Sequence, residues 1–308
     1  MSLAEANRRF FDAVSGSYDN KPWFAEVNKQ VTSELRDDLV WAGIPLTSTS
    51  TVTTTNAPPK EVRLLDYASG TGLMTRIFGP YVTSSRAIDI SPNMVTSYNA
   101  RARDAGLGET VVKGVVGDLF DKSHPSPAEF ESAEWWGFDV AAVGFAFHHF
   151  ADVAYAAGQL KARLRPGGVL VISDFLEGGD VLAGEDGKPV LGSEGNHAAH
   201  MHGHKHDDGS GHAHDHHHHH HHGEEGKIHD VGEATPEFKK KMNASIVVPH
   251  FTLEGVRQFF AEAGFVDVDV KTMKERSYME FAGKKLWRTI LFAKGRRPVE
   301  DGQEKSEL

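Results

Sequence analysis

Short apolar runs alternate with stretches of helical periodicity between residues 61 and 178. Near-continuous apolar runs of this length are typical of strands that are buried on both faces of a sheet. When a helix follows each strand, the usual arrangement is a parallel sheet with helices on both faces. We therefore predict an α/β fold with a mostly parallel central sheet. The runs read VRLLDYA, SRAIDI, TVVKGVVGDLF, FDVAAVGFAFHHF and GVLVISDF.

Two helices of this region carry start signals in the sequence. Ser91 is followed by Pro92, which predicts an N-cap and the first helical position of the stretch SPNMVTSYNARARDAG. Asp152 stands where a second N-cap is needed, directly before the stretch that begins at residue 153. A later amphipathic stretch, TLEGVRQFFAEAGF, predicts a further helix, and the β-type segments VDVDVKTM and LWRTILFAKG follow it.

The chain divides into segments of different composition. Residues 1–45 have helical spacing and predict an N-terminal helical cap, and residues 46–60 are rich in Ser and Thr and predict a surface loop. Residues 61–295 form the predicted main domain. We expect this domain to be interrupted by a disordered, His-rich insertion at 179–232, and we expect a charged tail at 296–308.

Composition excludes several classes of protein. The formal net charge of −10 gives no electrostatic footprint for a phosphate backbone, so we predict no nucleic-acid partner. The absence of cysteine excludes disulfides, thiolate zinc sites and a cysteine nucleophile. No apolar run reaches the roughly 18 residues of a membrane span, and the N-terminal segment lacks the apolar stretch of a signal peptide. We therefore predict a cytoplasmic protein with no membrane partner.

Acidic and glycine residues follow the first three strands in an ordered pattern. Asp66 precedes Gly70 and Gly72, whose turn lets a ligand approach the backbone and the N–H groups of a helix start. Asp89 ends the second strand, where a carboxylate can accept both hydroxyls of a ribose. Asp118 follows the third strand, where a carboxylate can accept the exocyclic amine of an adenine. All these positions fall at the edge where doubly wound sheets bind ligands.

These motifs resemble a known family. LLDYASGTGLMT, AIDISPNMV, VVGDLF, FDVAAVGFAFHHF and RLRPGGVLVISDF stand in the order and spacing of class I S-adenosylmethionine-dependent methyltransferases of type 11, which include the ubiquinone and menaquinone C-methyltransferases. The match covers about 61–178, with weaker support at 250–295. The resemblance implies a Rossmann-like, seven-stranded, mostly parallel sheet with helices on both faces, and S-adenosyl-L-methionine as the cofactor.

The resemblance also implies a role for individual residues. The glycine turn would hold the methionine moiety, Asp89 the ribose, and Asp118 with Leu119 the adenine edge. Ala68 replaces the first of three family glycines. Tyr18 has two interpretations, a contact with the cofactor or ordinary helix packing. The predicted cofactor-binding residues are Tyr18, Asp66, Ala68, Gly70, Gly72, Asp89, Ile90, Met94, Asp118 and Leu119.

A nicotinamide-dependent dehydrogenase is the alternative for such a glycine turn. A dehydrogenase needs a third small residue three positions after the second glycine, and this sequence has Thr75 there. The RPGG turn before the fifth strand is also similar to methyltransferases. Both features favour methyl transfer.

Three histidines are candidate bases for the chemical step. His148 and His149 follow the fourth strand, and His250 precedes the late helix. A base speeds methylation of a hydroxyl or an acidic carbon by about 10²–10⁴-fold. Each also has a purely structural interpretation, and we expect one of the two adjacent histidines to point into packing.

Histidines are concentrated in the predicted insertion, where 14 of the 19 lie between 197 and 222. Imidazoles at this density bind zinc, nickel or copper ions at neutral pH. No spacing singles out four ligands, so we predict a loose, non-catalytic metal-binding or gating loop near the acceptor. The predicted ligands are His202, His204, His206, His212, His214, His216 and His218.

The sequence therefore predicts an enzyme that transfers a methyl group from S-adenosylmethionine to a small-molecule acceptor, at an O, N, S or C atom. One alternative is a metal-binding or sensing protein on a methyltransferase scaffold. Another is a protein or RNA methyltransferase. The identity of the acceptor and the oligomeric state are not encoded in any motif, because the segments that select an acceptor vary freely on one fold.

Overall fold

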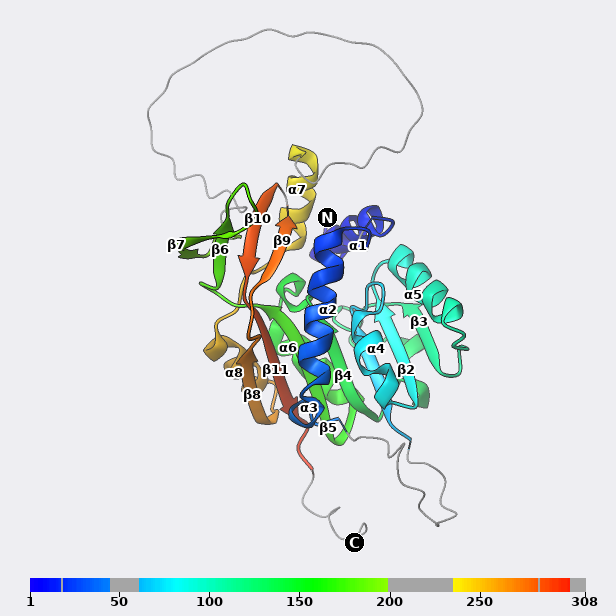
Figure 1. The fold of residues 1–308 in the computed structure, drawn as a ribbon. Coiled ribbons are helices and arrows are strands. Elements are labelled where there is room, and N and C mark those ends of the chain that lie inside the picture. The colour runs from blue at the N-terminus through cyan, green and yellow to red at the C-terminus, as the bar shows by residue number, and fades with distance from the viewer. Residues whose placement is uncertain (18, 45–60, 199–234, 282, 300–308) are drawn as a thin grey trace, which may run out of the picture.

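The computed structural model describes residues 1–17, 19–44, 61–198, 235–281 and 283–299. Within these ranges, the central sheet has seven strands in the order β3-β2-β1-β4-β5-β11-β8 (Figure 1). The five strands β3, β2, β1, β4 and β5 pair in parallel. Strand β11 runs antiparallel to both of its neighbours, β5 and β8. The predicted Rossmann-like sheet is thus confirmed. Its strands are β1 (Arg63–Tyr67), β2 (Ser84–Asp89), β3 (Val112–Val116), β4 (Phe138–Gly144), β5 (Leu164–Phe175), β8 (Val266–Thr272) and β11 (Ile290–Arg296).

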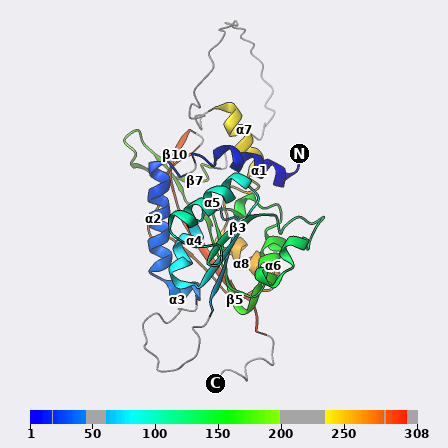
Figure 2. The ribbon, with the colours of Figure 1, turned by 90° about the vertical axis from the view of Figure 1, so that its right-hand side faces the viewer.

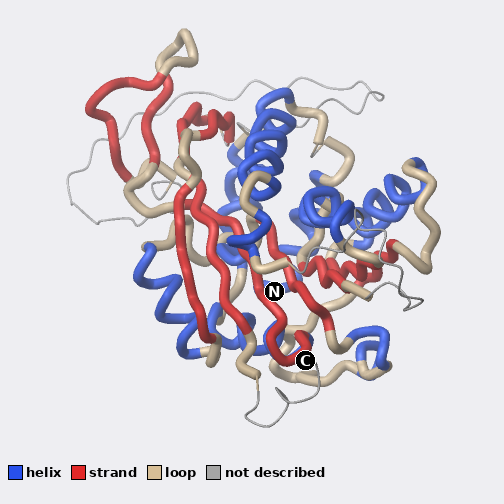
Figure 3. Tube along the Cα trace, turned by 60° about the horizontal axis from the view of Figure 1, so that its bottom comes forward, coloured by secondary structure: helices blue, strands red, loops and turns tan. Residues whose placement is uncertain are grey.

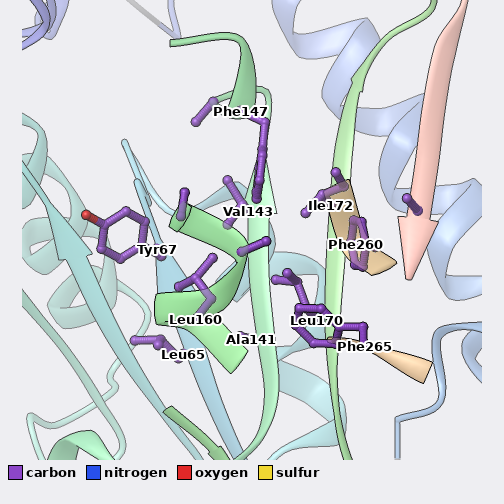
Figure 4. Packing of buried hydrophobic residues seen from close by; sticks show 14 of the residues in the cluster. Leu65, Tyr67, Ala141, Val143, Phe147, Leu160, Leu170, Ile172, Phe260 and Phe265 are labelled. Carbon is purple, nitrogen blue, oxygen red and sulfur yellow. The ribbon is translucent and has the colours of Figure 1, made fainter. Parts of the chain in front are cut away.

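Helices cover both faces of this sheet because adjacent strand residues point to opposite sides. Leu65 shares a buried cluster with Leu160 on one face (Figure 4). Its neighbour Leu64 shares a second cluster with Ile77 on the other face. The first face is covered by α6 (Val153–Arg163) and α8 (Leu253–Glu262), and the second by α4 (Leu73–Phe78) and α5 (Pro92–Asp104).

The predicted helix starts are confirmed at the atomic level. The Ser91 hydroxyl accepts a hydrogen bond from the Met94 amide at 3.1 Å, and Pro92 takes the first helical position of α5. Asp152 accepts from the Tyr155 amide at 2.9 Å and caps α6. Both helices begin where the chain leaves the carboxyl edge of the sheet, so the caps fix the loops that border the site.

Three helices precede the sheet and form the predicted cap: α1 (Leu3–Val14), α2 (Pro22–Arg36) and α3 (Leu39–Ala42). Helix α2 runs along the face that carries α4 (Figures 1 and 2). Helix α1 lies across the edge of the sheet, where Asp12 accepts a hydrogen bond from the Ser91 hydroxyl at 2.6 Å. The cap therefore closes over the edge at which the acidic and glycine residues gather.

A second, antiparallel sheet has the strand order β7-β6-β10-β9. It consists of β6 (Asp180–Ala183), β7 (Pro189–Gly195), β9 (Ser277–Phe281) and β10 (Lys284–Arg288), and Figure 3 shows the β6–β7 hairpin projecting from the central sheet. Our prediction of a disordered insertion is wrong for 179–198. The hairpin is ordered by pairing with β10, where Leu182 meets Leu286, and this partner lies about a hundred residues away in the sequence.

Several other predicted segments lie outside the described residues. These are the loop at 46–60, the histidine-rich stretch from residue 199 to 232, and residues 300–308 of the tail. The stretch is followed by α7 (Pro236–Ser245), which packs beside α1 (Figure 1). Among the described helices, none has the length and apolarity needed to cross a bilayer.

Candidate functional site

The turn between β1 and α4 depends on two glycines. Gly70 and Gly72 have φ of +51° and +93°, in the left-handed region that favours glycine. A Cβ on Gly72 would lie 2.9 Å from the ring of Tyr98, so no larger residue fits. A Cβ on Gly70 would meet no atom within 4 Å, because this residue borders open space. The turn thus exposes backbone to a cavity, as the sequence predicts.

Ala68 also has a left-handed backbone, with φ of +51°. This conformation costs an alanine roughly 1–2 kcal/mol, and a glycine would avoid this cost. A glycine also increases the entropy of the unfolded chain, which offsets part of the gain in stability. We expect Ala68→Gly to raise the free energy of unfolding by about 0.5–1 kcal/mol in chemical denaturation. Ala102→Gly, within α5, is the control and should lower stability. A similar loss in Ala68→Gly would show that the turn is not strained.

Asp66 lies behind the turn. It is fully buried, and its Oδ2 atom accepts hydrogen bonds from the amide and the hydroxyl of Thr75 at 2.9 and 2.8 Å. Burial raises the pKa of Asp66 to about 7, and the two hydrogen bonds from Thr75 only partly offset this. The cavity lining does not include Asp66, nor does it include Gly72. Both residues support the turn on the side that faces away from the cavity.

Asp89 lies in the cavity wall at the end of β2. Its Oδ2 accepts a hydrogen bond from the Gly70 amide at 2.7 Å, and its Oδ1 accepts from the Ser91 amide at 2.8 Å. Burial raises the pKa of Asp89 to about 6, against the lowering effect of these two amides. Asp89 thus links the glycine turn to the start of α5, so that the two loops share one carboxylate.

Asp118 lies in the cavity wall after β3, but its neighbourhood differs from the predicted one. Its Oδ1 atom is 3.1 Å from the Tyr67 hydroxyl and accepts from the Phe120 amide at 2.8 Å. The Leu119 amide, predicted to read the adenine edge, donates to the Tyr67 hydroxyl at 3.0 Å. The side chain of Leu119 is buried outside the cavity lining. Sequence reasoning missed Tyr67 and Phe120, whose rings pack 4.3 Å apart beside Asp118.

One cavity of about 260 Å³ joins these loops. Six of the predicted cofactor-binding residues line it: Ala68, Gly70, Asp89, Ile90, Met94 and Asp118. Helices α1 and α2 close it from the other side with Asn7 and Asn28. Tyr18 lies outside the described residues, but its neighbour Asp19 accepts a hydrogen bond from the Thr71 hydroxyl at 3.1 Å.

A second cavity of about 120 Å³ adjoins the first. Phe11, Phe24, Phe145 and His149 line both, so the two spaces meet between the cap helices and the end of β4. Several aromatic rings line the second cavity, and Phe145 stacks on Phe175 with centroids 5.2 Å apart. Phe145 has φ of +54°, a left-handed backbone that costs energy and points its ring to the junction.

His148 and His149 both line the second cavity, and both are buried. His148 Nδ1 is 2.9 Å from Asp174 Oδ1, and Asp174 Oδ2 accepts from the His148 amide at 3.1 Å. Asp174 is fully buried. His149 Nδ1 is 2.6 Å from the carbonyl of Ser245, which can only accept, so Nδ1 carries the proton. Burial lowers the pKa of His149 well below its ordinary range, and the adjacent His148 adds to this.

His250 is in neither cavity lining, although the adjacent Pro249 lines the second cavity. Its Nε2 atom is 2.8 Å from Asp180, which also accepts from Arg288 Nε at 2.9 Å. Burial alone would raise the pKa of Asp180, but the hydrogen bond from His250 and the charge of Arg288 lower it to about 2. This buried network joins β6 and β10 to the segment before α8. In the structure, His250 therefore belongs to a buried network that connects elements of the fold.

Metal ligands were predicted only in the histidine-rich stretch. His202, His204, His206, His212, His214, His216 and His218 all lie outside the described residues. In the part of the chain that the structure describes, no group of three or more His, Cys, Asp or Glu side chains is placed to hold a metal ion.

Comparison with known proteins decides the family. A family model described as a methyltransferase domain matches residues 50–270. The chain belongs to this methyltransferase family. An uncharacterised methyltransferase of Schizosaccharomyces pombe is 30% identical over 198 residues, which cover 59% of this chain and 68% of that protein. The demethylmenaquinone methyltransferase of Thermus thermophilus is 30% identical over 115 residues, 37% of this chain and 47% of that protein.

A solved structure supports the fold of this methyltransferase. The complex of the Haloferax volcanii Trm112 methyltransferase activator with a methyltransferase aligns with a TM-score of 0.51 at 14% identity. The alignment covers 95% of this chain and 97% of that chain. The family match identifies a class I, S-adenosylmethionine-dependent methyltransferase, and this structure agrees with its fold.

The first cavity fits a polar cofactor of this kind. Four residues of its lining each carry a buried oxygen without a hydrogen-bond partner in the described residues: Asn7 Oδ1, Asn28 Oδ1, Ser69 Oγ and Tyr155 Oη. A buried polar atom without a partner costs about 1–3 kcal/mol, so such atoms usually serve a ligand or water. S-adenosylmethionine carries ammonium, amine and hydroxyl donors that would satisfy them.

Proposed function

We propose that this methyltransferase transfers the methyl group of S-adenosylmethionine to a small molecule bound in the second cavity, at an O, N, S or C atom. The observation that carries the proposal is the junction of the two cavities. One contains six of the predicted cofactor-binding residues, the other is mostly apolar, and Phe11, Phe24, Phe145 and His149 line both. A methyl donor and an acceptor in these spaces would meet between the cap helices and the end of β4.

The cofactor residues follow from the first cavity. Asp89 would hold the ribose hydroxyls and Asp118 the adenine amine, while Ile90 and Met94 would pack on the adenine. Bound S-adenosylmethionine supplies a methyl group already activated by its sulfonium. The protein then mainly has to orient the acceptor, and orientation supplies roughly 7–11 kcal/mol of the barrier.

His148 is the proposed base. Its Nδ1–H points to Asp174, which leaves Nε2 to take a proton from an acceptor in the second cavity. The buried carboxylate fixes the tautomer and stabilises the cation that forms, so Asp174 is a positioning residue. His149 would stay neutral and offer Nε2 as a hydrogen-bond acceptor. We no longer assign a catalytic role to His250, because the described contacts place it in the Asp180 network.

The proposal is tested by finding the acceptor. Purified protein is incubated with radiolabelled S-adenosylmethionine and a cell extract, which is then separated into metabolite, protein and RNA fractions. We include demethylated quinones, because one relative is named for such an acceptor. Label in the metabolite fraction is expected. Label confined to protein or RNA would contradict the proposal and favour the macromolecular alternative.

The affinity for S-adenosylhomocysteine is expected to fall as the pH is lowered. Asp89 accepts hydrogen bonds best as a carboxylate, and its pKa is raised to about 6. Affinity should therefore be constant above pH 6 and should fall below it, approaching tenfold per pH unit. Calorimetry between pH 5 and 8 measures this. Asp66 titrates in the same range, with a pKa of about 7, so Asp89→Asn is the control. If the affinity of the Asp89→Asn variant depends on pH as strongly as that of the wild type, Asp89 is not the cause.

Metal binding by the histidine-rich stretch stays a prediction. Ala198, the last described residue before it, and Met242, in the helix α7 that follows it, both line the second cavity. Zinc, nickel or copper ions held there would therefore lie on a segment anchored beside the proposed acceptor site.

A further inference from the structure

A buried cation lies in the wall of the second cavity. Arg288, the last residue of β10, lines this cavity and is only 5% exposed. Its Cζ atom lies 3.6 Å from the centre of the Phe175 ring, which lines the same cavity and stacks with Phe145. A charged group is therefore held against the aromatic part of a mostly apolar lining.

The guanidinium of Arg288 has a nitrogen to spare. Nε donates to Asp180 Oδ1 at 2.9 Å, and Nη2 donates to the Pro249 carbonyl at 3.3 Å. Nη1 has no hydrogen-bond partner within the described residues, yet it is not among the unpartnered side-chain atoms that are sealed from solvent. Nη1 therefore keeps accessible surface, and a ligand can reach it from the cavity that Arg288 lines.

The scaffold fixes the direction of this nitrogen. Arginine commonly pairs with a carboxylate through two nitrogens, whereas here a single nitrogen, Nε, contacts Asp180. Asp180 is itself held by His250, whose Nε2 lies 2.8 Å from Asp180 Oδ2. Because these contacts hold the planar guanidinium in place, little side-chain entropy is lost when Nη1 binds a ligand.

The charges around Arg288 favour a neutral partner for Nη1. Asp180 pairs with the guanidinium directly, and Asp174 acts on it through its charge. Both carboxylates are fully buried, so their charges are poorly screened. They would repel a further anion, whereas a neutral carbonyl oxygen accepts the hydrogen bond without adding charge. Hydrogen bonds from a charged donor are also stronger than those between neutral groups.

We propose that Arg288 selects the acceptor by donating a hydrogen bond from Nη1 to a neutral carbonyl oxygen on an otherwise apolar molecule. This inference rests on the proposed function of the second cavity and deepens it, because it names a chemical group of the acceptor. The oxygen would lie beside the Phe175 ring, which also neighbours Phe145 and His148. The apolar remainder would pack against these rings, between Arg288 and the proposed base.

The test compares three probes of similar shape. Acetophenone carries a carbonyl on a benzene ring, α-methylstyrene has a CH₂ group in place of the oxygen, and benzoate carries an anion. NMR titration gives the dissociation constants for protein saturated with S-adenosylhomocysteine. The measured quantity is the affinity for acetophenone relative to that for α-methylstyrene, since this ratio cancels the effects of shape and hydration when variants are compared.

Two substitutions remove the Nη1 donor. Arg288→Met removes every donor and is expected to lower the ratio by about 10–100-fold. Arg288→Lys keeps a cation beside Asp180 but has one nitrogen in place of three, so it should lower the ratio as well while preserving the fold. Thermal unfolding without ligand checks that each variant is folded.

Arg163→Lys is the matched control. Arg163 is buried, and its Cζ atom lies 3.7 Å from the centre of the Trp136 ring, but it lines neither cavity. Its substitution should leave the ratio unchanged. An equal change in this control would show that the loss of any buried arginine disturbs the probes, and it would overturn the inference.

The outcomes separate this inference from the proposed function. Wild-type protein that binds neither acetophenone nor α-methylstyrene would contradict the proposed acceptor cavity and the inference with it. Wild-type protein that binds both, with the ratio unchanged in the folded Arg288 variants, would overturn the inference alone. Tighter binding of benzoate than of acetophenone would also overturn it, because the selected group would then be an anion.

Discussion

Replacing His148 by glutamine is expected to lower kcat for methyl transfer by about 10²–10⁴-fold. Glutamine retains a polar side chain in the second cavity but cannot take a proton. The contact at stake is the 2.9 Å pair between His148 Nδ1 and Asp174, which leaves Nε2 as the base. Label transfer from S-adenosylmethionine to the acceptor found in the extract measures kcat and KM separately. The loss should appear mainly in kcat, because a base acts in the transition state.

A matched control exists on the surface. His124 also pairs with an aspartate, with Nδ1 at 3.0 Å from Asp121 Oδ2, but it is exposed and lies in neither cavity lining. His124→Gln should leave kcat unchanged. If His148→Gln retains kcat while binding the acceptor normally, the second cavity contains no essential base. In that case the acceptor atom would be a nucleophile that needs no deprotonation.

Replacing Asp89 by alanine is expected to weaken S-adenosylmethionine binding by about 10–100-fold. The contacts that we propose would be lost are two charge-assisted hydrogen bonds to the ribose, each worth roughly 1.5–3 kcal/mol, and water would recover part of this. Asp89 also accepts from the amides of Gly70 and Ser91, so the variant should lose some stability as well. Calorimetry and thermal unfolding on the same protein measure both quantities.

The control for Asp89 is Asp104→Ala, which removes an exposed carboxylate from the other end of α5. It should change neither affinity nor the melting temperature by a significant amount. Unchanged affinity in a destabilised Asp89→Ala protein would mean that Asp89 only supports the loops. The ribose assignment would then fail, although the family membership would stand.

The sequence predicted the parts of this structure that depend on neighbouring residues. The spacing of apolar residues is a property of neighbouring positions in the chain. Strands β1 to β5 and the helix caps at Ser91 and Asp152 could therefore be predicted. The Gly70–Gly72 turn and Asp89 could also be placed, because their roles depend on a fixed position at strand ends.

Contacts between distant segments could not be predicted. The β6–β7 hairpin owes its order to β10, and its own Gly-rich sequence gives little sign of a strand. The Tyr67 hydroxyl reaches Leu119 across 52 positions, and Asp174 reaches His148 across 26. Apart from Phe145, His148 and His149, the second cavity is lined by residues from distant parts of the chain, so no single motif could predict it.

A crystal structure of the protein with S-adenosylhomocysteine tests the account most directly. We expect the ligand in the first cavity, with its ribose hydroxyls on Asp89, its adenine beside Asp118 and its sulfur at the end of β4 near Phe145. The sulfur would then face the second cavity. A ligand bound elsewhere, or bound with its sulfur away from the junction of the two cavities, would contradict the account.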